Sequence, residues 1–232
     1  MKLVTLNIQQ GGGRRIRGIL DYLRSQDADV IVLTEFRGNS NADAIRSGLE
    51  APGFRHFASA SIAPKENTVC IFSRQPFVPR TYLGLPVRDQ RRLISAHFDD
   101  LAIYGVYFAQ KQAKATLFEF LAGSSCRPTE AAHFIVGDFN TGLHFQDEEG
   151  ATFHCTAEFK ALSESGFVDS WRSRNLDTKE FSWYSNHSNG FRIDHVFASP
   201  EADSMIKRIF YDHTPREAKV TDHSALVVET VS

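Results

Sequence analysis

Polar side chains with catalytic potential follow a short apolar run near the middle of the chain. Phe134–Val136 ends in Gly137, and Asp138 and Asn140 come next, two residues apart. A run this short, bounded by Gly and followed by Asn-Thr-Gly, is typical of a buried strand rather than a helix. Alternation along an extended chain points Asp138 and Asn140 to the same side. The carboxylate can hold a metal or orient a water, and the amide can donate to a phosphoryl oxygen.

The same pattern, a carboxylate or amide at one end of an apolar run, recurs along the chain. The other positions are Asn7, Glu35, Asp194 with His195, and Asp222 with His223. Each has an ordinary structural alternative: Asn7 as a cap, Glu35 as a solvated strand end, Asp194 as a partner of Arg192. Gathered at one sheet edge, however, the carboxylates would repel one another unless a cation lay among them.

The ligand types indicate which cation and which chemistry to expect. Hard oxygen ligands, with no Cys and few convergent His, favour Mg²⁺ or Mn²⁺ over zinc. An Asp elsewhere in the fold can orient the imidazole of His223 and hold it protonated. A charged imidazole then stabilises the negative charge that builds up in a phosphoryl-transfer transition state.

Five motifs in order carry a specific resemblance. They are Leu6-Asn7-Ile8, Leu33-Thr34-Glu35, Gly137-Asp138-Phe139-Asn140, Arg192-Ile193-Asp194 and Thr221-Asp222-His223. Together they resemble the endonuclease/exonuclease/phosphatase superfamily, the fold of exonuclease III, abasic-site endonucleases, pancreatic-type deoxyribonucleases, inositol polyphosphate 5-phosphatases and sphingomyelinases. The match spans residues 7 to 223, which is nearly the whole chain.

Three further details resemble the exonuclease III branch of that superfamily. Tyr107-Phe108-Ala109-Gln110 is similar to a Tyr-x-Pro-x motif, with Ala109 where proline is usual. Phe181-Ser182-Trp183 precedes the Arg-Ile-Asp motif, and Phe191 stands where abasic endonucleases place a hydrophobic wall of the sugar pocket. Ordinary core packing is the alternative interpretation of Trp183 and Phe191.

The resemblance implies a role for each matched position. Glu35 is implied as the metal ligand, with Asn7 and Asp222 beside it in the metal set. Asp138 would orient or deprotonate the attacking water. Asn140, His223 and Tyr107 would donate to phosphate oxygens, Asp222 would orient His223, and Asp194 would support the same centre or a second metal.

DNA is the expected substrate, with damaged ends or single strands favoured over long duplex. Arg14, Arg15, Arg92 and Lys111 could contact phosphates on either side of the scissile bond, although solvated surface charge is the alternative for some of them. A phosphatase or phosphodiesterase for a small or lipid-linked phosphate is the second hypothesis. A binding module that lost the chemistry is the third, and the retained carboxylate cluster argues against it.

Bulk properties set limits on these hypotheses. The 232 residues are most simply one domain, residues 1–232, and 42 % apolar residues with 19 Phe supply an ample core. A net charge of −2 gives no global attraction to polyanions, so nucleic-acid binding must rest on a local basic face. The sequence has no membrane-length apolar run and no signal-peptide pattern. Three cysteines without Cys-x-x-Cys spacing suggest free thiols, and we expect a cytoplasmic monomer.

Many short strands and few helices must position the site. Strands are expected over residues 2–8, 29–33, 54–60, 68–73, 80–83, 93–98, 101–107, 134–136, 180–184, 193–198, 206–211 and 226–231, and helices over 14–25, part of 39–53, 113–123 and 156–165. Asp99-Asp100 is a plausible hairpin turn. Because helices interrupt only some strand pairs, the pattern predicts a four-layer α/β sandwich, in which two packed, mostly antiparallel sheets are flanked by helices.

Overall fold

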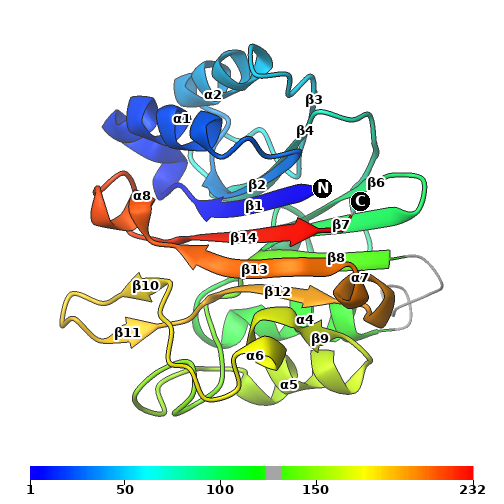
Figure 1. The fold of residues 1–232 in the computed structure, drawn as a ribbon, viewed down its shortest axis with the longest axis vertical. Coiled ribbons are helices and arrows are strands. Elements are labelled where there is room, and N and C mark those ends of the chain that lie inside the picture. The colour runs from blue at the N-terminus through cyan, green and yellow to red at the C-terminus, as the bar shows by residue number, and fades with distance from the viewer. Residues whose placement is uncertain (124–131, 232) are drawn as a thin grey trace.

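Two six-stranded sheets pack face to face in the computed structural model, which describes residues 1–123 and 132–231 (Figure 1). The first sheet has the spatial order β13 (Ile206–Asp212), β14 (Ala225–Thr230), β1 (Lys2–Asn7), β2 (Val30–Phe36), β4 (Thr68–Ser73), β3 (His56–Ser59). The second has the order β5 (Val78–Arg80), β6 (Leu93–His97), β7 (Leu101–Tyr107), β8 (Ala132–Asp138), β12 (Asp194–Ala198), β9 (Val168–Asp169). Only β1–β2 and β7–β8 pair in parallel among the described strands. The predicted sandwich of mostly antiparallel sheets is confirmed.

Helices cover the outer face of each sheet, with α1 and α2 on the first and α4 and α5 on the second (Figure 1). The α-helices are α1 (Ile16–Ser25), α2 (Ser40–Glu50), α3 (Val87–Gln90), α4 (Ala115–Ala122), α5 (Thr156–Glu164), α6 (Ser170–Arg174), α7 (Pro200–Ser204) and α8 (Thr214–Glu217). Two 3₁₀ segments, η1 (Gln10–Arg15) and η2 (Lys111–Lys114), precede α1 and α4, and a two-stranded ribbon joins β10 (Trp183–Tyr184) to β11 (Gly190–Phe191). Every helix in the described residues falls short of the length or apolarity that a bilayer crossing requires.

Strands near the middle of each sheet are buried on both faces. In β2, Val30 and Val32 point into the space between the sheets, whereas Ile31 and Leu33 point toward α1 and α2. Alternation along the strand therefore places apolar side chains in two cores at once, which explains the continuous apolar run in the sequence. Burying side chains of this size contributes about 1.5–3 kcal/mol each relative to exposure.

Several element boundaries differ from the predictions. The helix expected over 14–25 begins at Ile16, because Gly11–Gly13 have φ angles of 51° to 78° and form a separate 3₁₀ segment. The strand expected over 80–83 lies at Val78–Arg80, and only Trp183–Tyr184 of residues 180–184 is paired. Four helices of four or five residues were not predicted, because so few residues carry too little periodicity to detect.

Candidate active site

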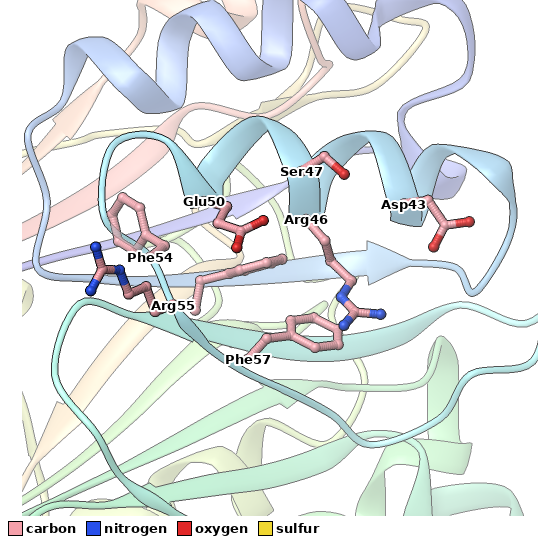
Figure 2. Close-up of a pocket in the computed structure, with 8 residues that line it drawn as sticks. Asp43, Arg46, Ser47, Glu50, Phe54, Arg55 and Phe57 are labelled. Carbon is pink, nitrogen blue, oxygen red and sulfur yellow. The ribbon is translucent and has the colours of Figure 1, made fainter.

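A cavity of about 320 Å³ lies between α2 and the β3–β4 hairpin (Figure 2). Phe54, Phe57 and the side of Glu50 form its wall, and the guanidinium of Arg46 lies over the Phe57 ring at 4.9 Å. None of the strand-end residues singled out in the sequence lines it. This cavity therefore does not hold the candidate site.

The strand-end residues meet elsewhere, where strand ends of the two packed sheets come together. Asn7 ends β1 and Glu35 lies near the end of the parallel strand β2, at a register shift where its φ is 55°. Asp138 ends β8 in the second sheet and is the direct cross-strand partner of Asp194, which begins the antiparallel strand β12. Strand direction and register therefore bring together four residues that are up to 187 positions apart in sequence.

An amide joins the carboxylates of the two sheets. The Asn7 side-chain nitrogen donates to Asp138 Oδ2 at 2.9 Å and to Glu35 Oε1 at 3.3 Å. The Tyr107 hydroxyl donates to the same Glu35 oxygen at 3.4 Å. Asn7, Glu35, Asp138 and Tyr107 thus form one connected polar cluster.

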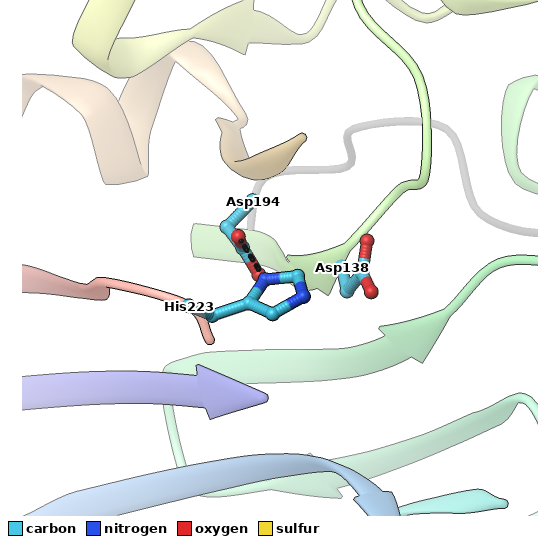
Figure 3. Close-up of side chains that lie close together, drawn as sticks. All are labelled: Asp138, Asp194 and His223. Atoms are coloured by element: carbon cyan, nitrogen blue, oxygen red, sulfur yellow. Dashed lines mark hydrogen bonds and ion pairs between the residues drawn. The ribbon is translucent and has the colours of Figure 1, made fainter. Parts of the chain in front are cut away.

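His223 faces this cluster with its ring between two carboxylates. Its Nδ1 lies 2.8 Å from Asp194 Oδ2, and its other nitrogen points toward Asp138 (Figure 3). The orienting carboxylate is therefore Asp194, and the expectation that Asp222 orients His223 is wrong. Asp222 lies at a bend directly before His223, and its carboxylate is bonded to other partners. Asp222 Oδ2 instead accepts from Gln9 Nε2 and Trp183 Nε1, both at 3.1 Å.

Arg192 is not the partner of Asp194 either. Its guanidinium is fully buried and donates to Asp147 Oδ1 and to Asp169 Oδ2, both at 2.6 Å. This network behind the site holds the start of β12 in place and leaves Asp194 free to pair with His223. His195, which follows Asp194, is buried, and its Nε2 lies 2.8 Å from the Thr141 carbonyl oxygen.

Burial and charge oppose each other in the titration of this site. Burial, followed by repulsion from Asp194, raises the pKa of Asp138 to about 7, although His223 offsets part of the shift. Burial alone would lower the pKa of His223, but attraction to Asp194 and then to Asp138 raises it to about 10. His223 is thus an imidazolium at neutral pH, ready to donate to an anion.

Gly137 in β8 and Asn140 in the turn after it fix the backbone around Asp138. Gly137 has a φ of +145°, and a Cβ there would lie 2.0 Å from the Val106 carbonyl oxygen, so only glycine fits. Asn140 has a φ of 51°, its backbone N–H donates to Asp138 Oδ1 at 2.8 Å, and its amide donates to the Phe108 carbonyl at 2.9 Å. The position of the Asp138 carboxylate is consequently set by residues on both sides of it.

Lys114 is a buried cation behind this turn. Its ammonium donates to the Asn140 carbonyl, and only 1 % of the residue is exposed. Burial lowers its pKa to about 8, with partial compensation by Asp138. The sequence did carry a signal for this residue, because Lys114 lies three, four and seven positions before the buried residues Leu117, Phe118 and Leu121. A lysine on the apolar face of a helix is unusual enough to mark a functional or structural role.

A cavity of about 360 Å³ opens over these residues. Its polar wall includes Glu35, Asp138, Asn140, Asp222 and His223, together with Lys111 and Lys114. Its apolar wall is formed by Phe153, Trp183, Phe191 and Ile193. Phe191 contacts both Trp183 and Phe153, with ring centroids 5.6 Å apart in each case. Trp183 and Phe191 are thus half-buried cavity walls as well as packing residues.

The predicted phosphate-binding residues separate into two groups. Lys111 lines the cavity, and Arg15 donates to the Gln9 side chain and lines a neighbouring groove. Arg14 is exposed and lines neither. Arg92 lies behind the site, 5.4 Å from the centre of the Tyr107 ring and 3.5 Å from Asp89. The structure therefore does not bring Arg14 or Arg92 to the cavity wall.

The oxygen atoms at the site fit a divalent cation. Among the described residues, Asp138, Asp194 and His223 offer ligand atoms that lie within 4.8 Å of one another. A protonated imidazole has no lone pair to give, however, so His223 is a poor ligand. The carboxylates of Glu35 and Asp222 line the same cavity, and the Asn7 amide bonds to Glu35. A set of carboxylate and amide oxygens suits a hard cation.

Comparison with known proteins agrees with this arrangement. The family model described as Endonuclease/Exonuclease/phosphatase family matches residues 4–223. An exodeoxyribonuclease of Bacillus subtilis (strain 168) is 24 % identical over 243 residues, covering 89 % of this chain and 91 % of that relative.

Solved structures show the same fold at low identity. The 3′ phosphatase NExo from Neisseria, bound to a product DNA hairpin, has a TM-score of 0.85 and 23 % identity, with all of both chains covered. An AP endonuclease from Archaeoglobus fulgidus has a TM-score of 0.84 and 20 % identity, again over all of both chains. The resemblance predicted from the five motifs is confirmed: this chain belongs to the Endonuclease/Exonuclease/phosphatase family and is a hydrolase of phosphoric ester bonds.

Proposed function

We propose that this protein is a Mg²⁺-dependent phosphodiesterase that hydrolyses DNA by in-line attack of water. The observation that carries the proposal is the buried His223–Asp194 pair, whose polar atoms lie within 4.8 Å of those of Asp138. An imidazolium, a carboxylate and an amide-bridged acidic cluster at one point suit a reaction in which negative charge grows on a phosphoryl group.

The side chains divide the work of that reaction. Asp138 orients the attacking water and takes its proton, because burial has given its carboxylate a pKa near neutrality. His223, held by Asp194, donates to a non-bridging oxygen as charge accumulates. Asn140 and Tyr107 are the further donors to the phosphate.

Glu35, with Asn7 and Asp222, would hold the cation. Mg²⁺ is the ion that suits these ligands best, and Mn²⁺ has similar preferences. When bound, it would neutralise phosphate charge and act as a Lewis acid at the phosphoryl oxygen. The chain itself contributes the geometry: the bond from Tyr107 to Glu35 and the bonds from Gln9 and Trp183 to Asp222 orient the ligand oxygens.

DNA is favoured as the substrate for two reasons. The relatives include an exodeoxyribonuclease, an AP endonuclease and a 3′ phosphatase bound to a DNA hairpin. The cavity also combines Lys111 with the aromatic side chains of Trp183 and Phe191, and these suit a phosphate and a sugar or base. A damaged end or a single strand needs less contact surface than a long duplex, so we propose that these are preferred.

We further propose one catalytic domain that acts as a monomer in the cytoplasm. Cys70 and Cys155 are buried free thiols, which supports a reducing compartment. Cys126 lies outside the described residues.

A parallel assay on several substrates tests the proposed function. The protein is incubated with Mg²⁺, or with chelator as a control, and with abasic duplex, plain duplex, single-stranded DNA or inositol phosphates. We expect metal-dependent cleavage of DNA, fastest at abasic or single-stranded substrates. Release of phosphate from inositol phosphates alone would contradict the nuclease proposal, and turnover of none of these substrates would contradict the proposed reaction altogether.

A further inference from the structure

A second cavity of about 410 Å³ adjoins the active site. Asp222 lines both cavities, so the two adjoin at that residue. The second one, which we call the basic groove, is lined by Arg15, Arg216 and Lys219 and by one exposed aromatic residue, Tyr184.

The groove is a local positive patch on a chain whose net charge is −2. Three cationic side chains line it against one carboxylate, that of Asp222. It therefore supplies the local basic face that binding of a polyanion requires on such a protein.

The other basic cluster of the sequence, Arg88, Arg91 and Arg92, is paired with acidic neighbours. Arg91 pairs with Glu66 at 2.6 Å, and Arg88 and Arg92 both pair with Asp89, at 3.4 and 3.5 Å. The contrast singles out the basic groove, whose residues come from three separate parts of the chain.

Tyr184 and Arg216 stack on each other at the groove, and Tyr184 stays partly accessible. Tyr184 is 40 % exposed, and the Arg216 guanidinium lies 4.6 Å from the centre of its ring. Phe181 supports the ring from the side, with centroids 5.9 Å apart. The Arg216 Nε donates to Ser224 Oγ at 2.9 Å, which fixes the guanidinium in place. Aromatic rings and guanidinium planes of this kind are the groups on which unpaired bases stack.

Gln9 ties the basic groove to the catalytic residues. Arg15 donates to the Gln9 side-chain oxygen and, at 2.9 Å, to its backbone carbonyl. Gln9 Nε2 in turn donates to Asp222 Oδ2 at 3.1 Å. A nucleic-acid strand bound in the groove would therefore have a fixed position relative to the active site.

We propose that the basic groove binds a single-stranded nucleic-acid segment next to the scissile phosphate. Bases of this segment stack on Tyr184 and Arg216, and its phosphates contact Arg15 and Lys219. The inference rests on the proposed function, because it extends the same substrate beyond the catalytic cavity.

Cleavage of substrates of increasing length tests this site. We would measure kcat/KM for bis(p-nitrophenyl) phosphate, for a dinucleotide and for single-stranded DNA up to roughly a dozen nucleotides. The variants are Tyr184→Ala, Tyr184→Phe, Lys219→Glu and, as a matched charge control, Lys207→Glu. Lys207 is also exposed but lies near the start of β13, at the end of the strand remote from the groove. Thermal unfolding checks that each variant is folded.

The parent enzyme should gain kcat/KM with strand length. Tyr184→Ala should lose about tenfold on the longer strands but nothing on the two small substrates, whereas Tyr184→Phe should keep the parent values. On long strands, Lys219→Glu should reduce the slope of log kcat/KM against log salt concentration by about 0.7. Lys207→Glu should not change this slope.

Two failures are distinguishable. If the parent cleaves long strands and Tyr184→Ala and Lys219→Glu show the same gain in kcat/KM with strand length, the groove assignment is overturned and the proposed function stands. If the parent hydrolyses only the small ester and no DNA of any length, the proposed function fails, and the groove assignment fails with it.

Discussion

Replacing Asp194 by asparagine tests how the site keeps His223 charged. The amide retains the shape of the carboxylate but removes the charge that faces Nδ1 at 2.8 Å. In the parent, the pKa of His223 is raised to about 10. Without Asp194, we expect burial to outweigh the remaining attraction to Asp138 and to bring that pKa to the ordinary value of about 6.5 or below.

The size of the effect follows from these values. At pH 7.5 a pKa of about 10 leaves roughly 0.3 % of the imidazole neutral, whereas a pKa of about 6.5 leaves only about 10 % protonated. Loss of the charged form alone therefore costs about tenfold in kcat. Loss of the orienting bond and of a preorganised donor to the transition state adds to this, for a total of about 10²–10³-fold.

Two measurements separate this role from that of Asp222. NMR titration of the His223 ring in metal-free protein should show a pKa below 7 in Asp194→Asn and a parent-like value in Asp222→Asn. Asp222→Asn should instead raise the Mg²⁺ concentration needed for activity. The assignment of roles is refuted if Asp194→Asn leaves His223 protonated at pH 7.5, or if Asp222→Asn is the variant that deprotonates it.

Three further changes give distinct outcomes. Because burial lowers the pKa of Lys114 to about 8, the parent should lose kcat/KM as the pH rises through about 8 and this ammonium loses its charge. Lys114→Arg should move that loss to higher pH. If the parent and Lys114→Arg lose kcat/KM at the same alkaline pH, the loss does not come from the Lys114 ammonium. Glu35→Gln should raise the Mg²⁺ requirement about 10–100-fold in a metal titration of activity, and an unchanged requirement would remove Glu35 from the ligand set. Gly137→Ala should lower the free energy of unfolding by more than about 3 kcal/mol in urea, because a Cβ meets the Val106 carbonyl oxygen at 2.0 Å; a loss below about 1 kcal/mol would mean that the backbone there can relax.

The strands buried on both faces were the most predictable elements. Thr68–Ser73 and Leu101–Tyr107 have the bounds that their apolar runs indicate, and Asp99-Asp100 turns between β6 and β7 as expected. In such strands every side chain contacts a core, so the local pattern determines the element. Polar residues at the ends of these runs were predictable for the same reason.

Contacts between those residues were less predictable. The pairing of His223 with Asp194 depends on where β12 begins relative to β8 and on which side of the chain His223 projects. Asp222, the neighbour in sequence, was the wrong choice because adjacent residues need not contact each other through their side chains, and the Asp222 carboxylate bonds to Gln9 and Trp183. Asp147 gave no signal, since a loop carboxylate becomes significant only when it meets a buried Arg192.

The basic groove could not be read from runs of charge. Arg14 and Arg92 belong to dense arginine clusters, yet the first is exposed away from the cavity and the second is paired with Asp89. Arg216 and Lys219 stand in no such cluster and reach the groove through the fold. Charge density in the sequence is a weak guide wherever acidic neighbours can neutralise it.

Single-turnover cleavage of an end-labelled DNA strand by Asp138→Asn tests whether the Asp138 carboxylate activates the attacking water. If the Asp138 carboxylate takes the proton of the attacking water, the asparagine amide of the variant cannot replace it. The cleavage rate in Mg²⁺ should then fall at least about 10²-fold. DNA affinity, measured by fluorescence anisotropy in the same samples, should stay near that of the parent. Cleavage by Asp138→Asn at the parent rate would contradict the account.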